Sequence, residues 1–463
     1  MRKLQQTWSP VDGSLYLERP YASPRQIAAA AGAAVKAQAT WKRLPLAERQ
    51  ALCRQAVACF VAHKEAIATE LCWQMGRPIR YCAGEVDGFA ERAHYMIDVA
   101  GEGLAAVSLP DQPGLRRYIR REPLGLVLVI APWNYPYLTA VNAIVPALLA
   151  GNAVLLKQSA QTPLCGERLQ QAFDAAGLPA GLFQHLHLNH EDTATLIGSD
   201  AINHVAFTGS VAGGVQVERA AAGRFIGVGL ELGGKDPAYV RADADLDHAV
   251  ATLVDGAFFN SGQSCCAIER IYVHGELYDA FVTRAVALIK QYRLGRPDHP
   301  DTTLGPLVRT SAADWVRAQI AEALAQGAVA QIDPTDFPLD RVGTPYLAPQ
   351  LLTRVDHSMR VMTEESFGPV VGVQAVASDE EALVLMNDSA YGLTAAIFTR
   401  DMDAGVALGE RVECGTLFLN RCDYLDPALA WSGLKGSGRG CSLSRLGYES
   451  LTRPKSFHLK TEL

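Results

Sequence analysis

Short apolar runs alternate with longer stretches of helical periodicity along most of this chain. The first run, Leu-Gly-Leu-Val-Leu-Val-Ile, lies at residues 124–130, and a helical stretch at 138–150 separates it from the next run, at 153–157. Strands that alternate with helices favour a parallel β-sheet covered by helices on both faces. We therefore expect an α/β protein, and this alternation restricts the fold more than any other feature.

The alternation falls into two regions on either side of Gly233-Gly234, where two adjacent glycines interrupt it. Before the first strands, residues 24–98 have the apolar spacing of helices, with caps expected at Ser23 and Gly76. The predicted strands lie at residues 124–130, 153–157, 183–188, 204–207 and 225–230 in the first region and at 270–273, 370–376 and 415–420 in the second. Because 463 residues exceed a typical domain of about 100–200 residues, we expect two or three domains.

Composition and charge restrict the class of protein. Hydrophobic residues make up 49% of the chain and charged residues 20%, which is typical of a folded globular protein. The net charge is −7 and no long basic block is present, so we expect no nucleic-acid partner. The longest apolar run is far shorter than the roughly 18 residues of a membrane span, and residues 1–20 lack the apolar segment of a signal peptide. We therefore expect a cytoplasmic protein with no membrane partner.

The ten cysteines and eleven histidines show no pattern of metal ligands. No two cysteines form a C-x-x-C pair, so we expect no metal site and mostly reduced, buried cysteines. Common nucleotide and hydrolase signatures are absent too, since there is no G-x-G-x-x-G after a strand, no P-loop, no G-x-S-x-G and no H-E-x-x-H. The chemistry must therefore be sought in other segments.

Three polar segments stand where predicted strands and helices end. Asn134, in Pro-Trp-Asn-Tyr-Pro, follows a buried strand, and its side-chain amide could donate a hydrogen bond to an oxyanion. Glu231 follows another strand, in an apolar setting that raises the pKa of a carboxylate and suits a general base. Cys265, in Gly-Gln-Ser-Cys-Cys, lies in a loop whose glycine can expose the thiol. Considered singly, these residues are better explained as a helix cap, a surface carboxylate and a core cysteine.

Together, these segments resemble the aldehyde dehydrogenase superfamily, in its NAD(P)-dependent, non-acylating form. Seven motifs of that family occur in order and at matching spacing over nearly the whole chain. They lie at residues 132–136, 157–160, 207–214, 231–235, 262–265, 365–370 and 437–440. The resemblance implies oxidation of an aldehyde to a carboxylic acid, with NAD or NADP as the cofactor.

The resemblance also implies roles for single residues. Cys265 is expected to attack the aldehyde as a thiolate, forming a thiohemiacetal and then a thioester. The amide of Asn134 and the backbone N–H of Cys265 are expected to hold the oxyanion, and Glu231 is expected to activate the water that hydrolyses the thioester. The residues expected to bind the cofactor are Trp133, Lys157, Ser210, Glu365 and Phe367.

Two positions depart from the family pattern. Ala160 stands where members that prefer NAD often carry a glutamate, which would repel the 2′-phosphate of NADP, so we expect both cofactors to be used. Ser442 stands where the family often has a glutamate near the exit for water and protons, so proton transfer is expected to depend more on Glu231 alone.

The fold that the resemblance implies is α/β with three parts. We expect a Rossmann-like parallel-sheet cofactor domain at residues 1–104 and 124–231, and a second α/β catalytic domain at 232–436. Residues 105–123 and 450–463 are expected to form a small β oligomerisation hairpin and tail, which pair strands between the subunits of a homodimer or homotetramer.

The substrate is less closely defined. Family members that oxidise succinate semialdehyde often carry an arginine eight residues after the oxyanion asparagine and another six residues before the nucleophile; here these positions are Asn142 and Phe259. We therefore expect a neutral aliphatic or aromatic aldehyde, with a succinate-semialdehyde dehydrogenase as the alternative if Arg421 supplies a cation. The predicted substrate pocket consists of Tyr137, Asn142, Phe259, Cys266, Arg421 and Tyr424.

Two further functions are compatible with the resemblance, a CoA-acylating enzyme and a catalytically silent binding protein. An acylating member usually lacks the carboxylate at the Glu231 position, and a silent relative would be expected to lose Cys265, Asn134 or Glu231. All three residues are present, which favours the hydrolytic enzyme.

Overall fold

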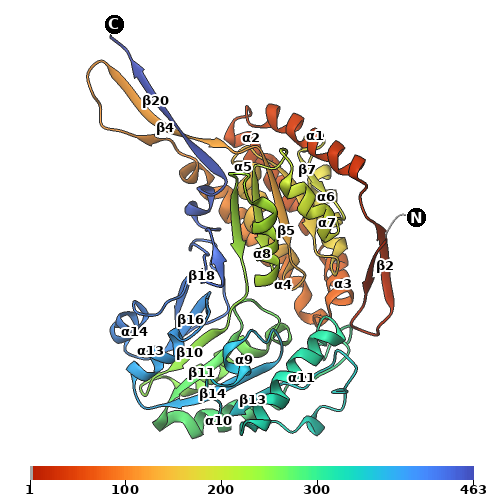
Figure 1. The fold of residues 1–463 in the computed structure, drawn as a ribbon, viewed down its shortest axis with the longest axis vertical. Helices are drawn as coiled ribbons and strands as arrows, with labels where there is room; N and C mark the ends of the chain where they lie inside the picture. Colours follow the sequence, from red (N-terminus) through yellow and green to blue (C-terminus); the bar gives the residue numbers. More distant parts are fainter. Residues whose placement is uncertain (1–3, 463) are drawn as a thin grey trace.

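The computed structural model describes residues 4–462, whose strands form two large sheets and three small ones. In Figure 1, one large sheet lies in the upper half of the molecule and the other in the lower half, while a ribbon of strands projects from the top. The functional segments predicted from the sequence lie in both halves.

The upper sheet has the strand order β19-β9-β8-β5-β6-β7. Its parallel strands are β5 (Leu126–Ala131), β6 (Ala153–Gln158), β7 (Phe183–His185), β8 (His204–Thr208) and β9 (Gly227–Glu231), to which β19 (Gly438–Arg439) is antiparallel. All residues of β5 and β6 are buried, as expected of central strands covered by helices. The predicted strands of this region are confirmed, although β9 begins later than predicted because Phe225 has a left-handed backbone, with φ 54°.

The predicted helical residues 24–98 form four helices, namely α1 (Pro24–Trp41), α2 (Leu46–Val61), α3 (Lys64–Met75) and α4 (Ile79–Gly103). Both predicted caps are present. The hydroxyl of Ser23 accepts a hydrogen bond from the backbone N–H of Gln26, and Gly76 ends α3 with φ 83°, a conformation that favours glycine. The other helices of this half are α5 (Pro136–Leu149), α6 (Pro163–Ala175), α7 (His190–Gly198) and α8 (Val211–Ala221).

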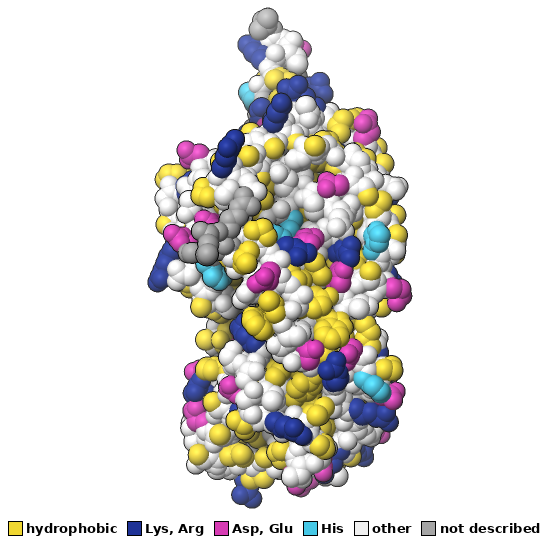
Figure 2. All heavy atoms as spheres, turned by 90° about the vertical axis from the view of Figure 1, so that its right-hand side faces the viewer, with side chains coloured by type: hydrophobic (Ala, Val, Ile, Leu, Met, Phe, Trp, Pro, Cys, Tyr) yellow, Lys and Arg dark blue, Asp and Glu magenta, His cyan; other side chains and the backbone are white. Residues whose placement is uncertain are grey.

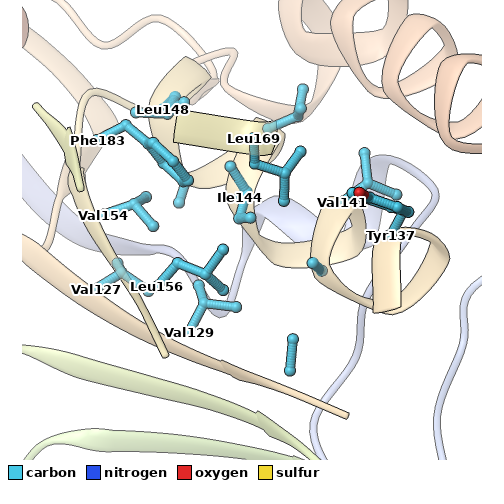
Figure 3. Packing of buried hydrophobic residues seen from close by; sticks show 14 of the residues in the cluster. Val127, Val129, Tyr137, Val141, Ile144, Leu148, Val154, Leu156, Leu169 and Phe183 are labelled. Carbon is cyan, nitrogen blue, oxygen red and sulfur yellow. The ribbon is translucent and has the colours of Figure 1, made fainter. Parts of the chain in front are cut away.

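The core of the upper half lies where α5 packs against β5 and β6. Apolar side chains of the two strands, such as Val129 and Leu156, face apolar side chains of the helix, such as Ile144 (Figure 3). Tyr137 belongs to this core, since it is only 1% exposed and its ring centroid lies 4.8 Å from that of Phe60 in α2. The prediction that Tyr137 lines the substrate pocket is therefore wrong, because its side chain packs against α2.

The lower sheet has the strand order β12-β13-β14-β11-β10-β16-β17, and all its neighbouring strands are parallel except β12 and β13. The strands are β10 (Asp236–Val240), β11 (Ile268–His274), β12 (Val329–Ala330), β13 (Gln350–Thr353), β14 (Val370–Val376), β16 (Thr394–Phe398) and β17 (Thr416–Leu419). The helices are α9 (Leu246–Phe258), α10 (Gly275–Ile289), α11 (Thr310–Ala325), α12 (Arg360–Thr363), α13 (Asp379–Asn387) and α14 (Met402–Gly409). The three strands predicted here are confirmed as β11, β14 and β17, whereas the other four strands were not predicted.

The small sheets lie outside these two layers. They consist of β1 (Leu4–Trp8) with β2 (Leu15–Pro20), of β15 (Tyr391–Gly392) with β18 (Leu434–Lys435), and of β3 (Val107–Ser108), β4 (Leu115–Pro123) and β20 (Thr452–Lys460). The β4–β20 ribbon projects from the molecule, and basic side chains gather on it (Figures 1 and 2).

No helix in the described part of the chain is long and apolar enough to cross a membrane. The boundaries of the three predicted domains stay a prediction.

Candidate active site

The loop that carries Cys265 is tightly constrained. After α9 the chain makes a single 3₁₀ turn (Phe259–Gly262), in which Asn260 and Ser261 have φ values of 51° and 58°. A Cβ at Gly262 would lie 2.3 Å from the carbonyl oxygen of Gly368, so only glycine fits there. This turn leads to Cys265, which is half-buried, and to Cys266, which is only 2% exposed. Of the two adjacent thiols, the predicted nucleophile is the accessible one.

The amide of Asn134 lies against this loop. Asn134 follows β5, is buried, and donates a hydrogen bond from Nδ2 to the carbonyl oxygen of Gln263, at 3.2 Å. The buried Arg77 holds Asn134 and the nucleophile loop, because its guanidinium donates to the carbonyl oxygen of Asn134 and to Oδ1 of Asn260. It also forms an ion pair with Glu85. A donor amide is thus held two residues from Cys265, as an oxyanion site requires.

Glu231, at the end of β9, is held by two hydroxyl groups. Ser442 donates to its Oε1, and Thr208 donates to its Oε2 at 2.9 Å. Burial raises the pKa of Glu231, while the hydrogen bonds from Ser442 and Thr208 act in the opposite direction. A carboxylate with a raised pKa next to a reactive cysteine suits general-base chemistry.

One cavity of about 240 Å³ brings these groups together with most of the predicted cofactor residues. Its lining includes Asn134, Glu231, Cys265, Trp133, Ser210, Glu365 and Phe367. The rings of Trp133 and Phe367 meet edge to face, with centroids 5.6 Å apart. Burial raises the pKa of Glu365 to about 8, and its Oε1 accepts a hydrogen bond from the backbone N–H of Gly234. The cavity therefore combines a thiol, an amide and two half-buried carboxyl groups between aromatic walls.

A second cavity, of about 570 Å³, continues from the first over the carboxyl ends of β6 and β8. It is lined by Lys157 and by the first turn of α8, which Ser210 caps by accepting a hydrogen bond from the N–H of Gly213. Lys157 is buried, its ammonium group makes no hydrogen bond within residues 4–462, and burial lowers its pKa to about 8. A helix N-terminus beside an unpaired ammonium group fits a phosphate-bearing cofactor such as NAD or NADP. Ser159 lines this cavity, whereas Ala160 is not part of its lining.

The remaining predicted pocket residues take different places. Phe259 is half-buried, with its ring centroid 5.2 Å from that of Tyr81. Arg421 is exposed and stacks on the ring of Tyr424, at 3.6 Å from the centroid. Cys266 is not among the residues that line the cavity of Cys265, and its thiol donates to Oδ1 of Asp423 at 3.0 Å. Its place in the substrate pocket stays a prediction. Asn142 is buried and accepts a hydrogen bond from Arg92.

Three functional candidates were missed by the sequence reasoning. Arg309, just before α11, lines both cavities and the cleft beside them, and its guanidinium makes no hydrogen bond among the described residues. Asp423 lies under the nucleophile loop and accepts hydrogen bonds from Ser264 and Cys266. Arg92, in α4, reaches the start of α5. None of these residues belongs to one of the seven motifs, so the motif pattern carries no signal for them.

Comparison with known proteins decides the family. The sequence model described as the aldehyde dehydrogenase family matches residues 2–457. The chain belongs to the aldehyde dehydrogenase family. The family, the α/β fold and the enzyme class predicted from the sequence are therefore confirmed, and this aldehyde dehydrogenase acts on a small-molecule aldehyde.

Relatives align with this aldehyde dehydrogenase over nearly its full length. An NADP⁺ succinate-semialdehyde dehydrogenase of Deinococcus radiodurans is 34% identical over 97% of this chain and 93% of its own. An NADP-dependent glyceraldehyde-3-phosphate dehydrogenase of Streptococcus equinus is also 34% identical, over 97% of this chain and 94% of its own.

Solved structures of relatives share the fold. The aldehyde dehydrogenase of Brucella melitensis biovar abortus superimposes with a TM-score of 0.95 at 28% identity, covering 100% of this chain and 95% of that one. The succinic semialdehyde dehydrogenase of Streptococcus pyogenes, solved with NADP⁺, superimposes with a TM-score of 0.93 at 28% identity, covering 98% of this chain and 99% of that one.

Proposed function

We propose that this aldehyde dehydrogenase oxidises its substrate through a thioester on Cys265, with NAD or NADP as the cofactor. The observation that carries the proposal is the single cavity lined by Cys265, Asn134 and Glu231 together with Trp133, Glu365 and Phe367. A reactive thiol, an oxyanion donor and a base thus meet in the cleft where the cofactor would lie.

The reaction begins at Cys265, the more accessible of the two thiols. Its thiolate adds to the aldehyde carbon, and the oxyanion that forms accepts hydrogen bonds from Nδ2 of Asn134 and from the backbone N–H of Cys265. The nicotinamide ring of the bound cofactor supplies the hydride acceptor. Loss of hydride from the thiohemiacetal leaves a thioester on Cys265.

Hydrolysis of the thioester is assigned to Glu231. A cavity of about 50 Å³ lies beside Glu231 and is also lined by Asn142, Cys441 and Ser442, which is room for a few water molecules. Glu231 takes a proton from water, which attacks the thioester and releases the carboxylic acid. The carboxylate at this position supports water, rather than CoA, as the acyl acceptor.

The cofactor site supports binding of both NAD and NADP. Lys157 and Ser159 offer donors in the cavity over β6, and the relatives named above include NADP-dependent enzymes. We assign Arg309 to the pyrophosphate, because it lines both cavities between the two ends of the site. Phosphate oxygens next to the α8 N-terminus would then meet an arginine from the other half of the molecule.

A direct assay tests the proposal. Purified enzyme is mixed with a panel of aldehydes and with NAD or NADP, in the presence and absence of CoA, and the reduced cofactor is followed by absorbance. We expect reduction of either cofactor without CoA and release of a free acid. Strict dependence on CoA, or full turnover by a Cys265→Ser variant, would exclude the thioester route proposed here.

We also propose that the protein acts in the cytoplasm as a homodimer or homotetramer, divided into the three domains given above. Strand β20 lies at the edge of its sheet and is mostly exposed, which supports pairing with a strand of another subunit. Light scattering of the full chain and of a chain ending at Glu449 should show the larger assembly only for the former. The same number of subunits per particle in the full and the shortened chain would contradict a role of this ribbon in assembly.

A further inference from the structure

A buried amide lines the small cavity beside Glu231. Asn142 lies in α5, only 3% of its surface is exposed, and it is part of the lining of the cavity of about 50 Å³. Its Nδ2 is buried and makes no hydrogen bond within the described part of the chain. Buried amide N–H groups are nearly always hydrogen-bonded, and water is the usual partner where the protein supplies none. A partner for this donor is therefore expected in the cavity.

Arg92 fixes the orientation of this amide. Its Nη1 donates to Oδ1 of Asn142 at 3.4 Å and to the carbonyl oxygen of Leu138, one turn earlier in α5, at 2.7 Å. A guanidinium group has donors only, so a reversed amide would place the NH₂ group of Asn142 against another donor. The amide oxygen is therefore held towards Arg92, and the N–H groups of Nδ2 remain for another partner.

Two cavities meet at Glu231. The small cavity, which contains Asn142, and the larger one, which contains Cys265, share the lining residues Thr139, Thr208 and Glu231. Thr139 and Asn142 are three residues apart in α5, so Asn142 lies about 4.5 Å along the helix axis from a residue that borders both cavities. The donor of Asn142 and the carboxylate of Glu231 thus line one cavity, which adjoins the cavity of the nucleophile.

Hydroxyl groups of the small cavity near Glu231 already donate to acceptors of the protein itself. Thr208 and Ser442 donate to Glu231, and Thr139 donates to a backbone carbonyl oxygen. His204 has an unpaired ring nitrogen, Nδ1, but it lies four residues before Thr208 on β8, or about 13 Å along the strand. Nδ2 of Asn142 therefore remains as a free donor at the Glu231 end of the cavity.

We propose that Asn142 positions the water that hydrolyses the thioester, by donating a hydrogen bond from Nδ2 to the water oxygen while the water donates to Glu231. The inference rests on the proposed function, since it takes Glu231 as the base and Cys265 as the site of the acyl group. Glu231 takes one proton of this water, the water oxygen bonds to the thioester carbon, and the carbon–sulfur bond breaks to release the acid and the thiolate of Cys265. With the cofactor and the acyl group in the larger cavity, water reaches Glu231 from the small one.

The decay of the acyl group on Cys265 tests the inference directly. The acyl group is formed in a single turnover with limiting aldehyde, and its loss is followed by rapid quenching and mass spectrometry, whichever step limits steady-state turnover. Asn142→Leu has nearly the same size and no donor, so we expect decay about ten- to hundredfold slower than in the wild type. The burst of reduced cofactor should keep its rate constant within about threefold, because hydride transfer does not use this water.

Hydroxylamine and a matched variant separate the positioning of water from general damage to the site. Hydroxylamine cleaves thioesters without the water, so it should remove the acyl group equally fast from the wild type and from Asn142→Leu. Ser450→Ala is the control, since its hydroxyl lines the same cavity but already donates to the carbonyl oxygens of Cys441 and Gly447, and its acyl group should decay as in the wild type. Equal slowing of the burst and of the acyl decay in Asn142→Leu would show a structural role and overturn the proposal.

A second variant and a crystal structure provide tests that do not depend on the folding of Asn142→Leu. Asn142→Asp keeps the shape and the acceptor for Arg92 but loses the N–H donor, so its acyl group should also decay slowly. A high-resolution crystal structure of the wild type should show a water within hydrogen-bond distance of both Nδ2 of Asn142 and the carboxylate of Glu231. Wild-type decay in Asn142→Asp, or a direct contact of the amide with the carboxylate, would contradict the proposal.

Failure of this inference and failure of the proposed function give different results. If the thioester route is wrong, no acyl group appears on Cys265 in the wild type or in Glu231→Gln. If only the role of Asn142 is wrong, the acyl group forms and then decays at the wild-type rate in both Asn142 variants.

Discussion

The hydroxyl of Ser442 donates a hydrogen bond to Oε1 of Glu231, from the position where the family often carries a glutamate. A second acid there would compete with Glu231 for protons, whereas a hydroxyl stabilises its ionised form. Together with Thr208, Ser442 therefore partly offsets the increase in pKa that burial imposes on Glu231.

Replacing Ser442 by alanine should move the pH profile of turnover. Without this donor the pKa of Glu231 rises further, so the base is protonated up to a higher pH and the acidic limb of kcat shifts upward by about one pH unit. Steady-state rates of wild type, Ser442→Ala and Ser442→Thr between pH 5.5 and 9.5 (~0.5 unit steps) measure the limb. Ser442→Thr keeps the hydroxyl and should follow the wild type. If the acidic limb of kcat has the same midpoint in Ser442→Ala as in the wild type, Ser442 does not influence the pKa of Glu231.

The two adjacent thiols should respond differently to substitution. Cys265→Ser should abolish production of the reduced cofactor, because the serine hydroxyl is a far weaker nucleophile. Cys266→Ser should retain most activity, since the hydrogen bond with Cys265 and burial raise the pKa of Cys266 and keep it a thiol, and a serine can donate to Asp423 as the thiol does. Initial rates measure the activity of each variant, and mass spectrometry after alkylation shows which of the two thiols reacts. The opposite result would assign the nucleophile to Cys266.

Glu231→Gln should separate the two halves of the reaction. Hydride transfer precedes hydrolysis, so this variant should give a burst of reduced cofactor, of about one equivalent per active site, followed by turnover slowed at least about a hundredfold. Stopped-flow absorbance resolves the burst, and mass spectrometry should detect an acyl group on Cys265. An unchanged steady-state rate would show that Glu231 is not the base that activates water for hydrolysis.

The affinity for NADP should fall as the pH rises through the pKa of Lys157. Burial lowers that pKa to about 8, so the ammonium group is charged below pH 8 and increasingly neutral above it. We expect the Kd of NADPH to rise between pH 7 and 9.5 by more than the Kd of NADH, because only NADPH carries the 2′-phosphate. Fluorescence titrations measure both constants. In Lys157→Arg, where the charge is permanent, the Kd values of NADPH and NADH should change equally with pH. If they already change equally in the wild type, the predicted role of Lys157 is wrong.

Most of the site residues predicted from the motifs share one cavity, while their roles stay a prediction. Asn134, Glu231 and Cys265 line one cavity because each follows a strand or helix whose end faces the same cleft, and that order along the chain is visible in the sequence. Arg92, Arg309 and Asp423 were missed, because only the packing of distant elements brings them to the site. Tyr137 was misplaced because α5 is apolar on nearly every side, so its periodicity does not tell which face meets the substrate.

The position of Arg77 makes the catalytic geometry a joint property of both halves of the chain. This one side chain ties α4 to the backbone of Asn134 and to Asn260 in the nucleophile loop, 183 residues away. Recombination between relatives that exchanges one half of the chain would therefore separate Arg77 from its partner Asn260. The hybrid would still need a matched pair at positions 77 and 260, so these two residues should be inherited together.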